Sequence, residues 1–251
     1  MNALLLAAGF GSRLGEMTIE TPKCLAKVGQ ETMLDHWLFK LKQLGVKRFF
    51  INTHYLADKV QDFIARHPLK DDITLLHEPK LLGTGRTILR NIELLEDKAC
   101  FIVHVDNYCL DLLDRFLLAH MNRPGNTVLT MLTFTTNAPE KCGIVEVDKD
   151  KRLISFHEKK ENPPSDRANG AVYIASRSFF EVLKSLEPEP TDLSCDIIPA
   201  LIGNIFCHHT DLYFEDIGTP SSLRKANEFL NRDFSDVSAT RVKQKTSRIS
   251  K

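Results

Sequence analysis

The residues best suited to chemistry lie near the amino terminus, directly after a short apolar run. They are Gly9 and Gly11, then Ser12 and Arg13, with Lys23 following a Thr-Pro pair. Glycines let backbone N–H groups approach a phosphate without an intervening side chain, and arginine and lysine supply positive charge and several hydrogen-bond donors. The segment therefore predicts a binding site for a triphosphate.

Other glycine loops bind different ligands, and the residues argue against two of them. A dinucleotide-binding loop has a third glycine where this chain has Leu14, and an acidic residue after the second strand, where it has Asn52. A P-loop closes with Gly-Lys-Ser or Gly-Lys-Thr, which this loop lacks. Considered alone, the Gly-x-Gly pattern is also compatible with a flexible turn that binds no ligand.

A carboxylate follows a later apolar run. Asp106 comes directly after the run 101–105, and open α/β sheets bind ligands at the carboxyl ends of their strands. An aspartate at such a position is about as often the cap of a turn or helix. Asp106 is therefore a candidate metal ligand.

The elements that must position these residues alternate in type along the first half of the chain. Short runs rich in β-branched and aromatic residues predict strands at 4–6, 49–51, 73–76, 101–105 and 127–134. Helical spacing of apolar residues predicts helices at 33–44, 56–65, 87–95 and 111–121. The alternation is typical of an α/β fold, with a Rossmann-like, mostly parallel sheet flanked by helices.

The second half changes to a smaller region of hairpins and short helices. Strands are predicted at 143–147, 153–156 and 171–174, and helices at 178–186, at 193–202 and after Thr219-Pro220. We expect one domain over 1–232, with halves 1–135 and 136–232. The residues 233–251 have no apolar periodicity and predict a basic, flexible tail.

The composition excludes several classes of protein. The 33 Lys and Arg residues equal the 33 Asp and Glu residues, which argues against nucleic acid or an anionic membrane as the main partner. No run reaches the roughly 18 apolar residues that span a bilayer, and the first residues carry no basic leader. We therefore expect a cytoplasmic protein. The six cysteines are scattered without a CxxC pair, so no disulfide framework is expected.

The first loop as a whole resembles the signature of the sugar-1-phosphate nucleotidyltransferases. The matching residues are the stretch Leu6-Ala7-Ala8-Gly9-Phe10-Gly11-Ser12-Arg13-Leu14 and the later pair Pro22-Lys23. The resemblance implies the nucleotide-diphospho-sugar transferase fold. It implies catalytic roles on the nucleotide's phosphates for Arg13 and Lys23, and nucleotide binding by Leu6, Ala8, Gly9, Gly11 and Ser12. Molybdenum-cofactor and isoprenoid-pathway nucleotidyltransferases carry a similar loop, so the loop indicates a reaction class rather than a substrate.

A later segment resembles the part of these enzymes that reads the base. It consists of Glu78 with Gly83 and Thr84. A glutamate there would accept hydrogen bonds from guanine, whereas thymine and uracil readers more often carry glutamine, so the resemblance favours GTP. Considered alone, 83–85 is equally well a loop that begins a helix.

The resemblance also implies a metal site and a sugar site. Asp106 and Asp216, the latter in an Asp-Ile-Gly-Thr motif, would hold Mg²⁺, which suits two carboxylates completed by phosphate oxygens and water. Lys159 would hold the sugar phosphate as a catalytic residue. The sugar itself would be bound by Gly143, Glu158, Asn169 and Gly170. A Glu-Lys pair after a strand is otherwise more often a solvated surface.

Several residues depart from the family pattern, among them Cys24, which stands where a second proline is frequent, and three others. Val105 stands where the family usually has glycine, Arg86 replaces a small residue behind the base loop, and Lys160 replaces the proline after Glu-Lys. None of these changes removes a predicted phosphate or metal ligand. Val105 and Arg86 bear on which base or sugar would fit.

The implied reaction joins an NTP and a sugar 1-phosphate into an NDP-sugar and pyrophosphate, without a covalent enzyme intermediate. GTP with mannose or D-glycero-D-manno-heptose 1-phosphate is favoured, and glucose 1-phosphate with dTTP or UTP is the alternative. A catalytically silent nucleotide-sugar-binding regulator is a further alternative, against which the retained charged residues argue. Similar enzymes are commonly dimers, so a homodimer is among the expected assemblies.

Overall fold

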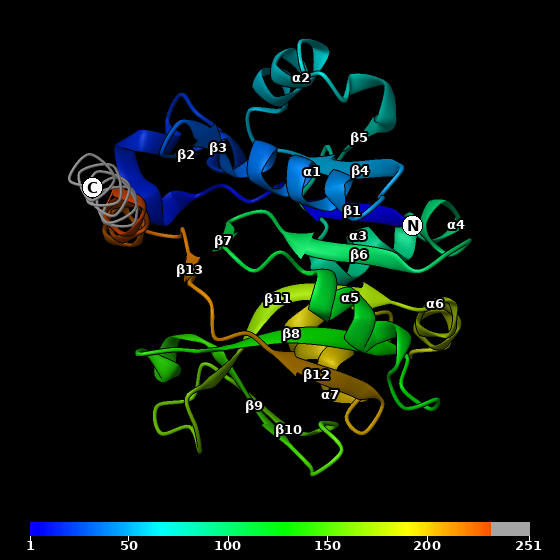
Figure 1. Cartoon of the computed structure of the whole chain (residues 1–251). Coiled ribbons are helices and arrows are strands. Elements are labelled where there is room, and N and C mark those ends of the chain that lie inside the picture. Colours follow the sequence, from blue (N-terminus) through cyan, green and yellow to red (C-terminus); the bar gives the residue numbers. More distant parts are fainter. Residues whose placement is uncertain (232–251) are drawn as a thin grey trace, which may run out of the picture.

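A nine-stranded sheet runs through the centre of the molecule in the computed structural model, which describes residues 1–231 (Figure 1). The strands follow the order β10-β9-β11-β6-β1-β4-β5, and β8 lies beside this path, paired with β11 and β12. The tail predicted over 233–251 lies outside the described residues.

The first half of the chain contributes four parallel strands. They are β1 (Asn2–Leu6), β4 (Arg48–Thr53), β5 (Ile73–His77) and β6 (Cys100–His104). In β1, Ala3 and Leu5 belong to one core cluster and Leu4 to another. Because successive strand residues point to opposite faces, both faces of this sheet are buried and need helices. The carboxyl ends of the parallel strands meet at one edge, where the glycine loop and Asp106 follow.

Helices cover both faces of this sheet (Figure 1). On one face lie α1 (Met33–Gln43), α2 (Ala57–Ala65) and α5 (Asp114–Met121). On the other lie α3 (Thr84–Arg90), α4 (Ile92–Leu95), α6 (Arg177–Lys184) and α7 (Ile198–Ala200). A further helix runs over 220–231. Within residues 1–231, no helix combines the length and apolar character needed to cross a membrane.

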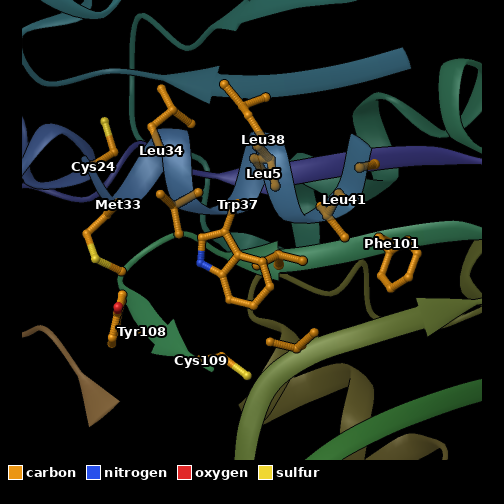
Figure 2. Close-up of a cluster of buried hydrophobic side chains, with 14 of the residues drawn as sticks. Leu5, Cys24, Met33, Leu34, Trp37, Leu38, Leu41, Phe101, Tyr108 and Cys109 are labelled. Atoms are coloured by element: carbon orange, nitrogen blue, oxygen red, sulfur yellow. The ribbon is translucent and has the colours of Figure 1, made fainter. Parts of the chain in front are cut away.

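Helix α1 shows how the local sequence sets an element. Thr32 accepts a hydrogen bond from Asp35 N, and Asp35 accepts one from Thr32 N, a capping box that satisfies N–H groups of the first turn. Trp37 points from the buried face of the helix toward β6 and the segment beyond it, and its indole N–H donates to Asn107 O at 2.8 Å (Figure 2). The helix is followed by Gly45 at φ +83°, a left-handed backbone conformation that commonly ends helices at glycine.

The second half adds mostly antiparallel pairs. The strands β9 (Gly143–Val147) and β10 (Leu153–Glu158) form a hairpin, and β11 (Arg167–Ala175) runs antiparallel to β6 and to β8 (Leu129–Thr135). β12 (Ile205–His209) is parallel to β8. Two small sheets stand apart: β2 (Lys27–Val28) with β3 (Glu31–Thr32), and β7 (Asn107–Cys109) with β13 (Phe214–Asp216).

The predicted α/β fold with its sheet and flanking helices is confirmed. The differences concern element ends and five strands that the sequence analysis did not predict, namely β2, β3, β7, β12 and β13. The helix predicted over 87–95 begins earlier, at Thr84, and is interrupted at Asn91, whose backbone is not helical. The helix predicted over 111–121 begins only at residue 114, because Leu113 has a left-handed φ of +64°.

The segment predicted as one helix over 193–202 has two parts. A π-helical turn, Leu193–Ile197, is followed by the short α7. Asp192 caps this turn by accepting hydrogen bonds from Ser194 N and Cys195 N. The cap places Asp192 beside α3, which bears on the site below.

Candidate active site

The predicted phosphate loop leaves β1 and enters a short 3-10 helix, Ser12–Thr18. Gly11 has φ +67°, which favours glycine, and its carbonyl accepts hydrogen bonds from Leu14 N at 2.8 Å and Thr18 Oγ1 at 3.1 Å. A Cβ added to Gly11 would lie 2.8 Å from Thr18 Cγ2. Glycine is therefore needed for the turn itself. The Arg13 side chain stays 67% exposed and available to a ligand.

A cleft of about 270 Å³ opens at the carboxyl ends of β1, β4 and β6. The predicted site residues in its lining are Leu6, Ala8, Gly9, Lys23, Gly83, Thr84 and Asp106. Polar side chains that the sequence analysis did not place in the site also line it: Asn52, Thr87, His104 and Asp192. Asn52 and His104 could have been found, because each lies at the end of a strand that reaches this edge.

Asp106 and Asp216 come together beside this cleft, 110 positions apart in the numbering, because β7 pairs with β13. The pairing sets Asp216 opposite Asn107, and Ile217 N donates to Asp106 O at 2.8 Å. Lys23 Nζ donates to Asp106 Oδ2 and lies 3.9 Å from Asp216 Oδ1. Arg13 Nη2 lies 3.7 Å from Asp216 Oδ2. The structure thus gathers two carboxylates around one ammonium, with a guanidinium at the side.

Helix α1 holds β7, the strand that directly follows Asp106, in place. Trp37 donates to the backbone there, as described above. His36 Nε2 lies 2.9 Å from Cys109 O. Lys40 Nζ donates to Asp111 O at 2.7 Å. Three side chains of one rigid helix therefore fix the backbone that follows Asp106.

Neighbouring charges and burial shift the pKa values of Asp106 and Asp216 in opposite directions. Burial works against ionisation of Asp106, but the charge of Lys23, then His104, and the hydrogen bond from Lys23 outweigh it, so the pKa of Asp106 is lowered. Partial burial and then the charge of Asp106 raise the pKa of Asp216, although Lys23 and Arg13 oppose the shift. Two negative groups thus compete for the same positive charge.

This donor set fits Mg²⁺. Among residues 1–231, no group of three or more His, Cys, Asp or Glu side chains comes together to hold an ion by itself. Mg²⁺ seldom receives such a cage and usually takes one or two carboxylates together with substrate phosphates and water. Asp106 and Asp216 offer two carboxylates that already surround a cation, Lys23 Nζ.

Glu78 differs from the sequence-based expectation that it reads a base in the cleft. The residue is buried behind the cleft wall and is not part of its lining. Its Oε1 accepts hydrogen bonds from Asn52 Nδ2 at 2.9 Å and Thr87 Oγ1 at 2.6 Å. Its Oε2 accepts one from Leu82 N at 3.1 Å. Both carboxylate oxygens are therefore bound within the protein.

The glycines of the predicted base loop, Gly83 and Gly85, are needed for contact with another backbone segment. A Cβ at Gly83 would lie 2.5 Å from Thr191 O, and one at Gly85 would lie 3.0 Å from Asp192 N. Thr84 Oγ1 donates to Asp192 Oδ2 at 3.1 Å. The glycines make room for the 191–192 backbone, which forms a wall that no local signal in the sequence predicts.

The predicted sugar residues Gly143, Glu158 and Lys159 meet at the end of the β9–β10 hairpin. Gly143 stands opposite Glu158, and a Cβ there would lie 2.6 Å from Glu158 Oε2. Lys159 has φ +48°, and its Nζ lies 3.0 Å from Glu158 Oε1. The hydrogen bond to Glu158 raises the pKa of Lys159 despite partial burial, so the ammonium keeps its charge.

Asn169 and Gly170 lie where β11 changes register. Asn169 Nδ2 donates to Tyr173 Oη at 2.7 Å, and its Oδ1 accepts from Ala171 N at 2.9 Å. A Cβ at Gly170 would lie 3.0 Å from Leu132 O. These bonds fix the amide of Asn169 and leave one of its N–H groups for a ligand.

The departures from the family pattern at Val105, Arg86 and Lys160 lie in different places. Val105 is buried and lines the cleft. Arg86 turns away from the cleft, since its Nε donates to Glu189 Oε1 at 2.9 Å. Lys160 is exposed. Of the three, Val105 alone lies in the lining of the cleft.

Comparison with known proteins identifies the family. The nucleotidyl transferase family model matches residues 2–233. The chain belongs to this family. Its relatives include the bifunctional protein GlmU of Methanocaldococcus jannaschii, which is 27% identical over 92% of this chain and 54% of that protein. They also include the mannose-1-phosphate guanylyltransferase catalytic subunit beta of Dictyostelium discoideum, 26% identical over 89% of this chain and 62% of that protein. The chain spans 54% to 66% of the length of the curated relatives it matches.

Solved structures of the nucleotidyl transferase fold resemble the chain as well. One is a Bacillus anthracis protein assigned as a glucose-1-phosphate thymidylyltransferase, in complex with sucrose. It has a TM-score of 0.81 and 24% identity over 91% of this chain and 94% of that chain. HddC of Yersinia pseudotuberculosis, complexed with GMP-PN, has a TM-score of 0.75 and 23% identity over 91% and 99% of the two chains. At these identities the likeness shows the fold.

Proposed function

We propose that the chain transfers a nucleotidyl group from an NTP to a sugar 1-phosphate and releases pyrophosphate. The observation that carries the proposal is the meeting of Arg13, Lys23, Asp106 and Asp216 beside the cleft at the strand ends. The charge of Arg13 also acts on the pKa of Lys159. Lys159, at the end of the β9–β10 hairpin, therefore lies close enough to Arg13 for the two charges to interact. A site of this kind can bring two polyanions together.

The proposed reaction is an in-line attack of a sugar phosphate oxygen on the α-phosphorus of the NTP. Arg13 and Lys23 would neutralise the phosphates of the NTP, and Lys159 would orient the sugar phosphate. The acceptor phosphate is already ionised at neutral pH, so no general base is needed. Catalysis would come from alignment and charge neutralisation, as in other phosphoryl and nucleotidyl transfers.

Asp106 and Asp216 are the residues that would hold Mg²⁺ in this proposal. When bound, Mg²⁺ would polarise phosphate oxygens and offset the charge that develops on pyrophosphate. The chain itself contributes the two carboxylates and keeps them together through the β7–β13 pairing. Lys23 then remains as a second positive group for the phosphates.

For substrates we propose GTP with mannose 1-phosphate or D-glycero-D-manno-heptose 1-phosphate. Relatives named mannose-1-phosphate guanylyltransferase support this choice. The carboxylate of Glu78 does not support it, because the residue is absent from the cleft lining and both carboxylate oxygens accept hydrogen bonds within the protein. Glucose 1-phosphate with dTTP or UTP is the alternative, in keeping with the name of the Bacillus anthracis structure.

A screen of pyrophosphate release tests the proposal. GTP, UTP, dTTP, CTP and ATP are each paired with mannose, heptose and glucose 1-phosphates in the presence of Mg²⁺. We expect release above the EDTA control for at least one pair, and the highest kcat/KM with GTP. Nucleotide binding without release from any pair would instead support a silent nucleotide-sugar-binding regulator.

A further inference from the structure

Glu78 sits at the centre of a buried hydrogen-bond network behind the cleft. We infer that it is a positioning residue, which fixes the backbone around the nucleotide whatever the base, and that base selection depends on other groups. The inference rests on the proposed function, since it takes the cleft to be a nucleotide site. It concerns Glu78 and its partners Asn52, Leu82 and Thr87.

The network is almost entirely buried, and three donors use most of the acceptor sites of the carboxylate. Glu78 and Asn52 are each 4% exposed, and Thr87 is 1% exposed. Three donors point at the Glu78 carboxylate, at 2.6 to 3.1 Å. The backbone of Glu78 is held as well, because its N–H donates to Thr53 O at 2.8 Å. A buried carboxylate is stable only with such partners. An acceptor site used in this way cannot accept a hydrogen bond from a nucleotide base.

One arm of the network holds the loop that follows β5. Leu82 N donates to Glu78 Oε2, which closes the turn over 78–82 onto its own first residue. Leu81 and Gly83, on either side of Leu82, both line the cleft. Thr87 ties the carboxylate to α3, the helix that follows the loop. The position of the loop after β5, which lines this side of the cleft, therefore depends on the Glu78 carboxylate.

The other arm reaches the phosphate loop. Asn52 uses both ends of its amide, since its Nδ2 donates to Glu78 Oε1 and its Oδ1 accepts from Ala7 N at 2.7 Å. Glu78 thereby fixes which way the amide faces, and the amide fixes the start of the glycine loop at Ala7. A continuous path of hydrogen bonds joins Ala7, Asn52, Glu78 and Leu82, so one side chain sets two parts of the cleft.

A carboxylate is the chemically required group at this position. A glutamine would have to present its NH₂ either to Leu82 N or to Asn52 and Thr87, so that donors would face donors. An unmatched buried donor weakens the arm to which it belongs. Glu78→Gln should therefore loosen the cleft for every nucleotide. If Glu78 read guanine, the same change would shift preference from GTP toward UTP and dTTP.

The test measures Kd for GTP, UTP and dTTP with Mg²⁺ by calorimetry, on wild type, Glu78→Gln, Thr87→Val and Thr87→Ser. Thr87→Val keeps the shape and removes the hydroxyl donor, while Thr87→Ser keeps the donor and is the matched control. We expect Glu78→Gln and Thr87→Val to weaken all three nucleotides by about the same factor, roughly tenfold or about 1.4 kcal/mol. Thr87→Ser should stay within about threefold of wild type. In steady-state assays the KM for the NTP should rise and that for the sugar 1-phosphate should not.

Several results would overturn the inference. One is a loss of GTP affinity in Glu78→Gln with UTP or dTTP affinity kept or improved. Another is unchanged Kd values with only a lower melting temperature, which would make the network a structural brace. Should Glu78→Gln not fold, the Thr87 pair gives the same readout. Wild type that binds nucleotides but releases no pyrophosphate contradicts the proposed function and leaves this test intact, whereas wild type that binds none of the three contradicts the inference.

Discussion

Replacing Lys23 by methionine removes the ammonium between Asp106 and Asp216 while keeping much of the apolar side chain. Lys23 is 11% exposed, and its Nζ lies 3.9 Å from Asp216 Oδ1 and donates to Asp106. Two unit charges about 4 Å apart interact by about 4 kcal/mol at an effective dielectric constant of about 20. Asp106 and Asp216 are 31% and 51% exposed, so solvent screens part of this. We expect Lys23→Met to lower the free energy of unfolding by about 1–3 kcal/mol.

The same variant separates two roles of the ammonium. Without it the phosphates of the NTP lose a positive partner, and kcat/KM should fall by at least about a hundredfold. The two carboxylates, however, lose the cation that competes with a metal ion. Added MgCl₂ should therefore raise the melting temperature of Lys23→Met more than that of wild type, as measured by differential scanning calorimetry.

Lys23→Arg is the matched control for this experiment. It keeps the positive charge at a similar reach, so its stability without Mg²⁺ should lie closer to that of wild type. The reasoning is refuted if Lys23→Met retains wild-type kcat/KM. It is also refuted if the melting temperature of Lys23→Met does not respond to Mg²⁺ any more than that of wild type.

Three further changes test other parts of the molecule. Lys159→Ala should raise the KM for the sugar 1-phosphate at least about tenfold and leave that for the NTP within about twofold, because one charge-assisted contact is lost; Lys160→Ala is the neighbouring control, and equal effects of both would contradict the assignment. Gly143→Ala should do similar harm to sugar-phosphate use, since its Cβ would meet the Glu158 carboxylate at 2.6 Å; a wild-type KM would show that the carboxylate need not lie there. Burial, aided by the charge of Arg123, lowers the pKa of His120 from 6.5 to about 4 in the folded protein. The contribution of the neutral imidazole to the free energy of unfolding is therefore fully present above about pH 6.5 and is lost as the pH falls toward 4. Urea unfolding at pH 7 and pH 5 should therefore show about 2 kcal/mol more loss for wild type than for His120→Gln, and equal losses would rule this group out.

The parts of the site that sequence predicted are those with a local signal. Short apolar runs placed β1 and β6, and the glycine loop and Asp106 follow those strands directly. Parallel strands bring their carboxyl ends to one edge, so Asp106 and the glycine loop had to lie near each other. Lys23 could be placed because the family's signature includes it. The predictions for the glycine loop and Asp106 needed only a strand end and the residues after it.

The parts that sequence could not predict depend on contacts between distant segments. The strands β7 and β13 have three residues each, too few for a visible alternation, so the pairing that unites Asp106 and Asp216 was not predicted. The family resemblance implied only that the two aspartates share a metal ion. The 191–192 wall is recognisable only from the space left at Gly83 and Gly85. The position of Glu78 at a strand end was evident, but the direction of its side chain was decided by donors from other elements, which no local pattern reveals.

The central claim is that two aspartates from distant parts of the chain serve one nucleotidyl transfer. The most direct measurement compares pyrophosphate release by wild type, Asp216→Asn and Asp211→Asn, with GTP, mannose 1-phosphate and Mg²⁺ or with the best pair from the screen. Asp211 is 96% exposed and lies outside the cleft lining, so it is the matched control. We expect Asp216→Asn to lower the rate at least about a hundredfold and Asp211→Asn to leave it unchanged. A wild-type rate in Asp216→Asn would contradict the account.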